Sequence, residues 1–169
     1  HLSWRGASSL AAMPARARRW RERQLERAAV SGVMDALSNQ IAGRFVRAQA
    51  AGLAALEQLN SHPAAQWPRR GQLQQLAHLL VAESAQSLQN RSARDQHLQA
   101  ALHPQLAKAA PVAHEGALLR SVHWAVEERD ADLARSRLAD LPQGASRRIQ
   151  ALRLKLRTAQ LGGATAEAL

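Results

Sequence analysis

The stretch LLRSVHWA at residues 118–125 is followed 34 residues later by LRLKLRTA at residues 152–159. The aligned pairs are Leu118/Leu152, Val122/Leu156, Ala125/Ala159 and, farther along, Ala134/Ala168. Two paired helices with their turns take about 34 residues. Such a pair cannot bury its apolar face alone and must stack on a neighbour. We therefore predict an all-α fold, an antiparallel helix-hairpin (tetratricopeptide-like) superhelical array.

The composition supports a helical chain. Hydrophobic residues make up 46% of the sequence but aromatic residues only 3%, so Ala and Leu must build the core. Both are strong helix formers, and small Ala side chains let helices approach closely. No alternating run of Val, Ile or Thr predicts a strand. Cysteine is absent, which excludes disulfides, thiolate metal sites and a cysteine nucleophile.

Four hairpins are expected in a repeat domain that spans residues 28–169. They lie near residues 28–60, 70–104, 112–142 and 146–169, with turns near 43, 89, 129 and 163, and the last hairpin is truncated. In the first hairpin, Gly43 is followed by Phe45, Ala48 and Ala55 at the offsets of the tetratricopeptide pattern. Both chain ends look cut, so we expect a fragment of a longer protein.

The N-terminal segment, residues 1–27, is strongly basic. It carries seven Arg and two Glu, within a chain of net charge +10. Pro14 suits the first turn of a helix, so we expect a basic helix over residues 14–27. The residues expected to contact a membrane or another anionic surface are Arg16, Arg18, Arg19, Trp20, Arg21 and Arg23. Two alternatives stay open: a solvated helix whose Arg residues pair with Glu22 and Glu26, and a helix that contacts nucleic-acid phosphates.

The order of these features resembles the N-terminal region of the proteobacterial HemY family. The residues that carry the resemblance are the Arg-rich stretch 16–23 and the stretch 43–45 that follows the next helix, together with the turn region at 129–130. The resemblance implies a protein of the bacterial inner membrane whose membrane helices lie upstream. Its tetratricopeptide-like domain would face the cytoplasm. It also implies an association with a late step of haem synthesis, with no catalytic residues to carry over.

The sequence offers no set of residues typical of an enzyme. Seven His are present, but none lies in a Cys-x-x-Cys-His or His-Glu-x-x-His motif. Of these, His97, His103, His114 and His123 form the one cluster for which metal or haem ligation is worth testing. No Gly-x-Ser-x-Gly motif supports a serine nucleophile. We therefore predict a non-catalytic protein and expect no cofactor, while porphyrin binding stays open.

The predicted function is a protein-interaction scaffold that is anchored at the inner membrane and holds haem-biosynthesis enzymes or a porphyrin intermediate. Repeat arrays bind partners in a concave groove. The groove residues expected from the first helices of hairpins are Arg120, His123, Arg153 and Arg157. Their positive charge suits porphyrin propionates or acidic peptides. The alternative function is a nucleic-acid-binding module that uses the Arg-rich N-terminal helix.

Overall fold

The computed structural model describes residues 4–61 and 67–167, with side chains for residues 15–61 and 67–163. Throughout these ranges the ordered elements are helices, and no strand occurs among them, which confirms an all-α fold. The helices are α1 (Trp4–Ile41), α2 (Phe45–Ser61), α3 (Arg70–Ser87), α4 (Arg91–Ala101), α5 (Pro104–Ala109), α6 (Pro111–Glu127), α7 (Ala131–Ala139), α8 (Gln143–Ser146) and α9 (Ile149–Glu167).

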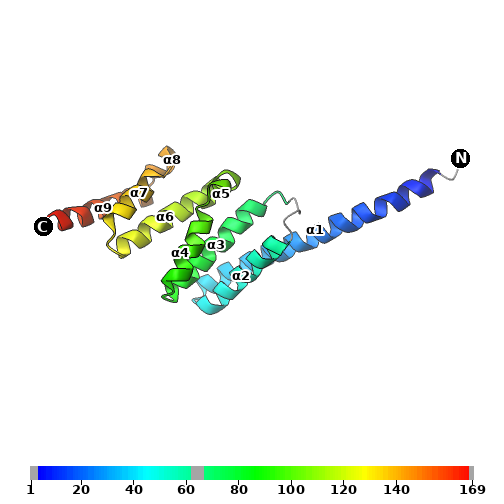
Figure 1. Ribbon diagram of the computed structural model, residues 1–169, viewed down its shortest axis with the longest axis horizontal. Coiled ribbons are helices and arrows are strands. Elements are labelled where there is room, and N and C mark those ends of the chain that lie inside the picture. The colour runs from blue at the N-terminus through cyan, green and yellow to red at the C-terminus, as the bar shows by residue number, and fades with distance from the viewer. Residues whose placement is uncertain (1–3, 62–66, 168–169) are drawn as a thin grey trace.

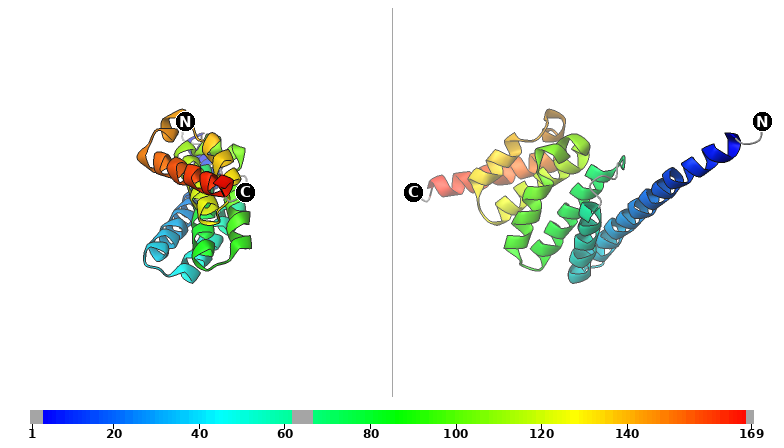
Figure 2. Two further views of the ribbon diagram at one scale, coloured as in Figure 1. Left: turned by 90° about the vertical axis from the view of Figure 1, so that its left-hand side faces the viewer. Right: turned by 45° about the vertical axis from the view of Figure 1, so that its right-hand side comes forward.

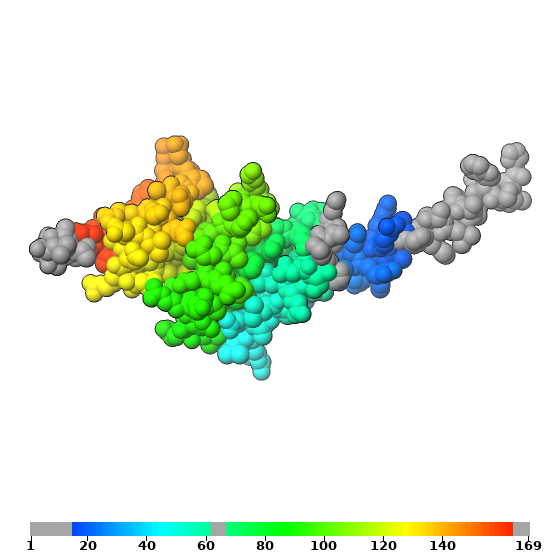
Figure 3. All heavy atoms as spheres, in the orientation of Figure 1, coloured from blue at the N-terminus to red at the C-terminus, as the bar shows by residue number. Residues whose placement is uncertain are grey.

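The helices follow one another along the long axis of the molecule (Figure 1). Helix α2 folds back along the second half of α1, and α3 packs against both. Helix α4 pairs with α3, and α6 carries α7 and α9 at the C-terminal end. The first half of α1 extends away from the other helices (Figure 2). Each helix therefore packs mainly on helices close to it in the chain, and the coloured atoms of α1 and α9 lie on opposite sides of the described molecule (Figure 3).

Three turns share one backbone geometry. Each contains a single residue in the left-handed region, Gly43 at φ 71°, Gln89 at φ 59° and Arg129 at φ 62°. In each turn the next amide donates to the carbonyl five residues back at 2.8 Å, and the left-handed residue donates to the carbonyl three residues back at 3.1 Å. This pair of bonds ends a helix and reverses the chain. The turns predicted near 43, 89 and 129 are confirmed.

Short polar side chains begin the second helix after two of these turns. The Asn90 side chain accepts a hydrogen bond from the amide of Ala93 at 3.1 Å, and Asp130 does the same for Leu133 at 2.9 Å. Such caps satisfy amides that a helix leaves without partners in its first turn. In both turns, a left-handed residue (Gln89 or Arg129) is thus followed at once by a residue that caps the next helix (Asn90 or Asp130).

The core is divided into successive clusters rather than gathered at one centre. One cluster joins α1, α2 and α3 through residues such as Val33, Leu56 and Val81. A second joins α6, α7 and α9 around Val122. Between them, Trp124 of α6 packs on Ala82 and Leu98. Small side chains bring the helices close: Gly52 of α2 lies against Val81 of α3, where a Cβ would come within 2.7 Å of Cγ2.

Two predicted boundaries are wrong. Helix α1 begins at Trp4, so Pro14 lies inside it and not at its first turn. Helix α9 continues through Gly162 and Gly163 to Glu167, so the fourth predicted turn is absent. The two glycines stand where a helix can tolerate them, because neither adopts the left-handed φ found at Gly43. The short helices α5 and α8 are additions that the sequence pattern did not predict. None of the helices in the described ranges is long and apolar enough to cross a membrane.

Two glycine replacements compare a glycine in a turn, Gly43, with a glycine inside a helix, Gly163. Gly43→Ala should lower the free energy of unfolding by about 1 kcal/mol, because an alanine side chain is disfavoured at positive φ. Gly163→Ala should raise it by about 0.5–1 kcal/mol, because Gly163 is exposed within α9 and alanine favours a helix. Urea denaturation measures both. A loss of stability for Gly163→Ala would mean that the chain turns there after all.

Candidate functional site

The basic half of α1 presents the predicted contact residues to solvent. All six of Arg16, Arg18, Arg19, Trp20, Arg21 and Arg23 are exposed. The structure places them on one continuous helix, and Arg19 and Arg23 border a hollow that Trp67 also lines. Arg23 is ordered by a hydrogen bond from its Nε to the carbonyl of Arg19 at 3.3 Å. The prediction that these residues occupy one helix is confirmed, and what they contact stays a prediction.

An exposed apolar line continues the same helix. Val30, Met34, Leu37 and Ile41 follow each other at spacings of four and three, and all are exposed. This spacing keeps them on one face of a helix. A hollow of about 460 Å³ opens at the N-terminal end of this line, where Arg27 and Val30 of α1 face Arg69 at the start of α3. Helix α1 therefore offers charge at one end and apolar surface at the other.

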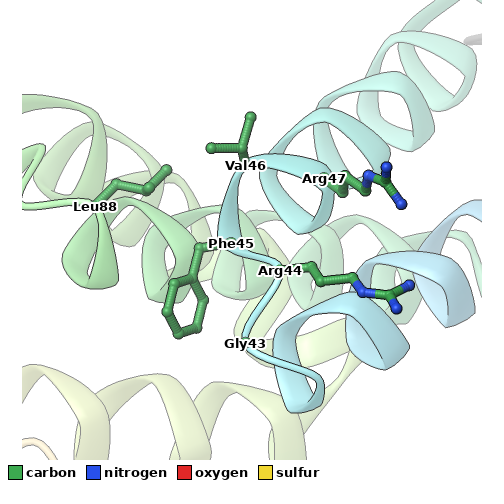
Figure 4. A pocket seen from close by; sticks show the side chains of 6 residues that line it. All are labelled: Gly43, Arg44, Phe45, Val46, Arg47 and Leu88. Atoms are coloured by element: carbon green, nitrogen blue, oxygen red, sulfur yellow. The ribbon is translucent and has the colours of Figure 1, made fainter.

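A second apolar hollow lies at the Gly43 turn. It has a volume of about 550 Å³, and its apolar lining comes from Phe45, Val46 and Leu88 (Figure 4). Arg44 and Arg47 extend along the other side of the turn (Figure 4). Phe45 occupies the position where the tetratricopeptide pattern has an aromatic residue, and its side chain is half-buried. Its neighbour Val46 is exposed.

A buried arginine joins the two halves of the molecule. Arg94 of α4 is only 4% exposed. Its guanidinium donates to Glu128 at 2.5 Å and to Asp95 at 2.7 Å. It also donates to Gln86 at 2.8 Å and lies 5.5 Å from the ring centre of Trp124. Burial lowers the pKa of Arg94, but the bonds to Glu128 and Asp95 outweigh burial and raise it. The cluster holds α3, α4 and α6 in one register.

The predicted groove residues fall into two separate pairs. Arg120 of α6 forms an ion pair with Glu83 of α3, and His123 lies 3.1 Å from Glu127. Burial raises the pKa of Glu83, and the charges of Arg120 and His123 oppose this rise. These two predicted residues are therefore engaged within the protein.

The other predicted pair lies on α9. Arg153 and Arg157 are exposed and one helical turn apart. Within the described part of the chain no ion pair or hydrogen bond links them to Arg120 or His123. The two pairs thus belong to different helices, and only the pair on α9 presents charge that is not already paired among the described residues.

The four clustered histidines do not gather around one point. His97 faces His78, with 3.0 Å between their Nδ1 atoms, while His114 lies 3.3 Å from the side-chain nitrogen of Gln75. His103 accepts from the amide of Gln105 at the start of α5. Across the described residues no three His, Asp or Glu side chains come together as a metal ion would require.

Neither family models, nor curated proteins, nor solved structures compared with this chain produced a match. No family is therefore assigned to it, and its function has to be inferred from its own surfaces. Sequence reasoning missed the Arg94 cluster because an arginine on an amphipathic helix normally faces solvent. The only hint lay in the acidic residues of the turn at 127–130, one of which supplies Glu128.

Replacement of Glu128 tests the buried cluster. Glu128→Ala should lower the free energy of unfolding by about 2 kcal/mol, because hydrogen bonds to a buried charge are lost while Arg94 stays in place. Glu127→Ala is the matched control, since Glu127 is exposed and its loss should cost about 0.5 kcal/mol or less. Equal losses in urea denaturation would show that Arg94 does not depend on Glu128.

The histidine pair makes stability depend on pH. Burial, with a smaller contribution from His97, lowers the pKa of His78 from 6.5 to about 4. Between these values the unfolded chain binds a proton that the folded chain refuses, so stability should fall as the pH drops from about 7 towards 4. Histidine NMR titration gives the pKa directly, and His78→Gln should reduce the pH dependence of unfolding. Titration of His78 near 6.5 would contradict its burial.

Proposed function

We propose that this chain is a non-catalytic protein-interaction scaffold built as a tetratricopeptide-like array of antiparallel helix hairpins. The observation that carries the proposal is the repeated turn. Gly43, Gln89 and Arg129 adopt the same geometry, and each reverses the chain into a helix that packs on its predecessor. An array built this way stabilises itself through neighbouring contacts and leaves long side faces open to partners.

The open surfaces favour binding over catalysis. Two of them are apolar and lie on α1 and around Phe45, and the basic half of α1 is a third. Exposed apolar patches of this kind mark interaction sites in soluble domains. The titratable groups with clearly shifted pKa values, Glu83, Arg94, His78 and His97, are each engaged with another side chain in the described part of the chain.

The basic half of α1 supports the proposal that this protein lies at a membrane surface. We propose that the parent protein is anchored in the bacterial inner membrane and that α1 holds the array beside the cytoplasmic leaflet. Cytoplasmic flanks of membrane helices are rich in Lys and Arg, and each such charge near an anionic surface contributes about 1 kcal/mol. The exposure of Arg16, Arg21 and Trp20 leaves these groups accessible to headgroups.

The resemblance of residues 16–23 and 43–45 to the HemY family suggests the partners. We propose enzymes of late haem synthesis, with a porphyrin intermediate as a further ligand. The exposed charges of Arg153 and Arg157 suit carboxylates on either kind of partner. The alternative, a nucleic-acid-binding module, rests on the same exposed arginines of α1 and requires an affinity that falls steeply with salt.

Affinity capture from cells decides between the two functions. The chain should retain haem-synthesis enzymes after nuclease treatment, and Phe45→Gln or Ile41→Gln should reduce the retained amount, because each replacement puts a polar group on an apolar surface. Val112→Gln, on an exposed residue of α6, is the control. Loss of every captured protein after nuclease treatment, or nanomolar RNA affinity at low salt, would contradict the scaffold in favour of nucleic acid binding.

Vesicle flotation tests the membrane role of α1. The chain should float with vesicles of anionic lipid and not with neutral ones, because the arginines attract anionic headgroups. Flotation should weaken strongly in the variant that changes Arg16, Arg18, Arg19 and Arg21 to Gln. The control variant removes four charges elsewhere, at Arg44, Arg47, Arg135 and Arg147. If both variants float alike, net charge and not α1 is responsible, and the role assigned to α1 is wrong.

A further inference from the structure

The outer face of α9 is apolar and uncovered. One side of this helix packs on α6 and α7 through Ala151 and Leu154. The opposite side exposes Ile149, Leu152 and Leu156, which are 69%, 51% and 61% accessible. Their spacings of three and four residues place them in one stripe along the helix. Figure 1 shows α9 at the C-terminal end of the stack.

The internal repeat indicates what covers such a face. At the 34-residue offset, Leu152 corresponds to Leu118 and Leu156 to Val122 on α6. Those two residues are 3% and 0% accessible, because α7 and α9 pack over them. The same face of the corresponding helix is therefore covered by α-helices. On α9 this face has no such cover within the described part of the chain.

Positive charge borders the stripe on both edges. Arg153 and Arg157 run along one edge, and both are exposed without an ion pair in the described part of the chain. Lys155 lies along the other edge, where its ammonium donates to the carbonyl of Ser146 at 3.1 Å. The sequence of α9 contains no acidic residue before Glu167. An occupant of this face gains most if it carries carboxylates beside its apolar residues.

A second copy of this chain does not fit the face. Two α9 stripes placed together would bring Arg153 and Arg157 of one copy beside those of the other. The exposed apolar line on α1 is no better, because it continues into Arg27 and Arg23 on the same face of that helix. Like charges in contact oppose both arrangements.

We propose that the stripe Ile149, Leu152 and Leu156 with Arg153 and Arg157 is a docking site for an acidic amphipathic α-helix. Apolar residues of that helix pack on the stripe, and Asp or Glu residues along its edge pair with the two arginines. This is helix-on-helix recognition of the kind that α7 and α9 provide for α6. The site rests on the proposed scaffold function and names the chemistry of one partner.

Three synthetic helical peptides test the site. They share leucines at the a and d positions of each heptad and differ at the flanking e and g positions, which carry Glu, Gln or Lys. In fluorescence anisotropy the Glu peptide should bind most tightly and the Lys peptide at least about tenfold more weakly. Changing Arg153 and Arg157 together to Gln should bring the Glu and Gln peptides to similar affinity.

Apolar variants complete the test. Leu152→Gln with Leu156→Gln should weaken the Glu peptide by about tenfold or more. Leu53→Gln with Val112→Gln, which changes two exposed apolar residues elsewhere, should leave it unchanged. Far-UV spectra check that each variant folds. The stripe is exposed, so these changes remove no core contact.

Several results would overturn the proposal. Equal affinity for the three peptides, or unchanged affinity in the α9 variants, would exclude the site. Self-association that disappears in the Leu152/Leu156 variant would mean that a second copy occupies the face. Binding to anionic vesicles that is lost in the same variant would mean that lipid occupies the face. Failure of the peptides while affinity capture through α1 or Phe45 succeeds would reject this site and leave the scaffold function standing.

Discussion

A pair of helices made from Ala and Leu can cover only one of its sides by itself, and the rest of this structure depends on that constraint. The other side of each pair must pack against the next pair. The outcome is a row of clusters, one around Leu56 and Val81 and another around Val122, with the Trp124 contact between them. Stability is therefore local, and long-range order depends on the few residues that bridge neighbouring clusters.

Arg94 is the polar member of that bridge. A buried guanidinium is tolerated only when its donors are satisfied, and here residues from α3 and α4 and the residue after α6 supply the acceptors. The arrangement fixes how α4 and α6 meet, because a shift of either helix would leave a buried charge without partners. The ring of Trp124 adds both apolar contact and a face for the cation.

Much of the fold follows from the sequence, but several of its most informative details do not. The turns near 43, 89 and 129 stand where helical apolar spacing breaks. Left-handed residues at Gln89 and Arg129 could not be foreseen, since neither is a glycine. The glycine pair at 162–163 led to a wrong turn prediction, because the presence of glycine alone does not reveal whether the chain turns.

The 34-residue repeat has a similar limit as a guide to burial. Leu152 and Leu156 occupy the positions of Leu118 and Val122, yet they are exposed where their counterparts are buried. Sequence periodicity gives the direction of a side chain on its helix but not whether another helix covers it.

The central claim is that the helices form an extended stack with open side faces, and small-angle X-ray scattering tests it most directly. A single compact core of 169 residues would have a radius of gyration of about 15 Å. The stack, with α1 projecting beyond it, should give a clearly larger value and an asymmetric distance distribution with a long tail (Figure 1). A radius close to the compact value, with a symmetric distribution, would contradict the stacked arrangement.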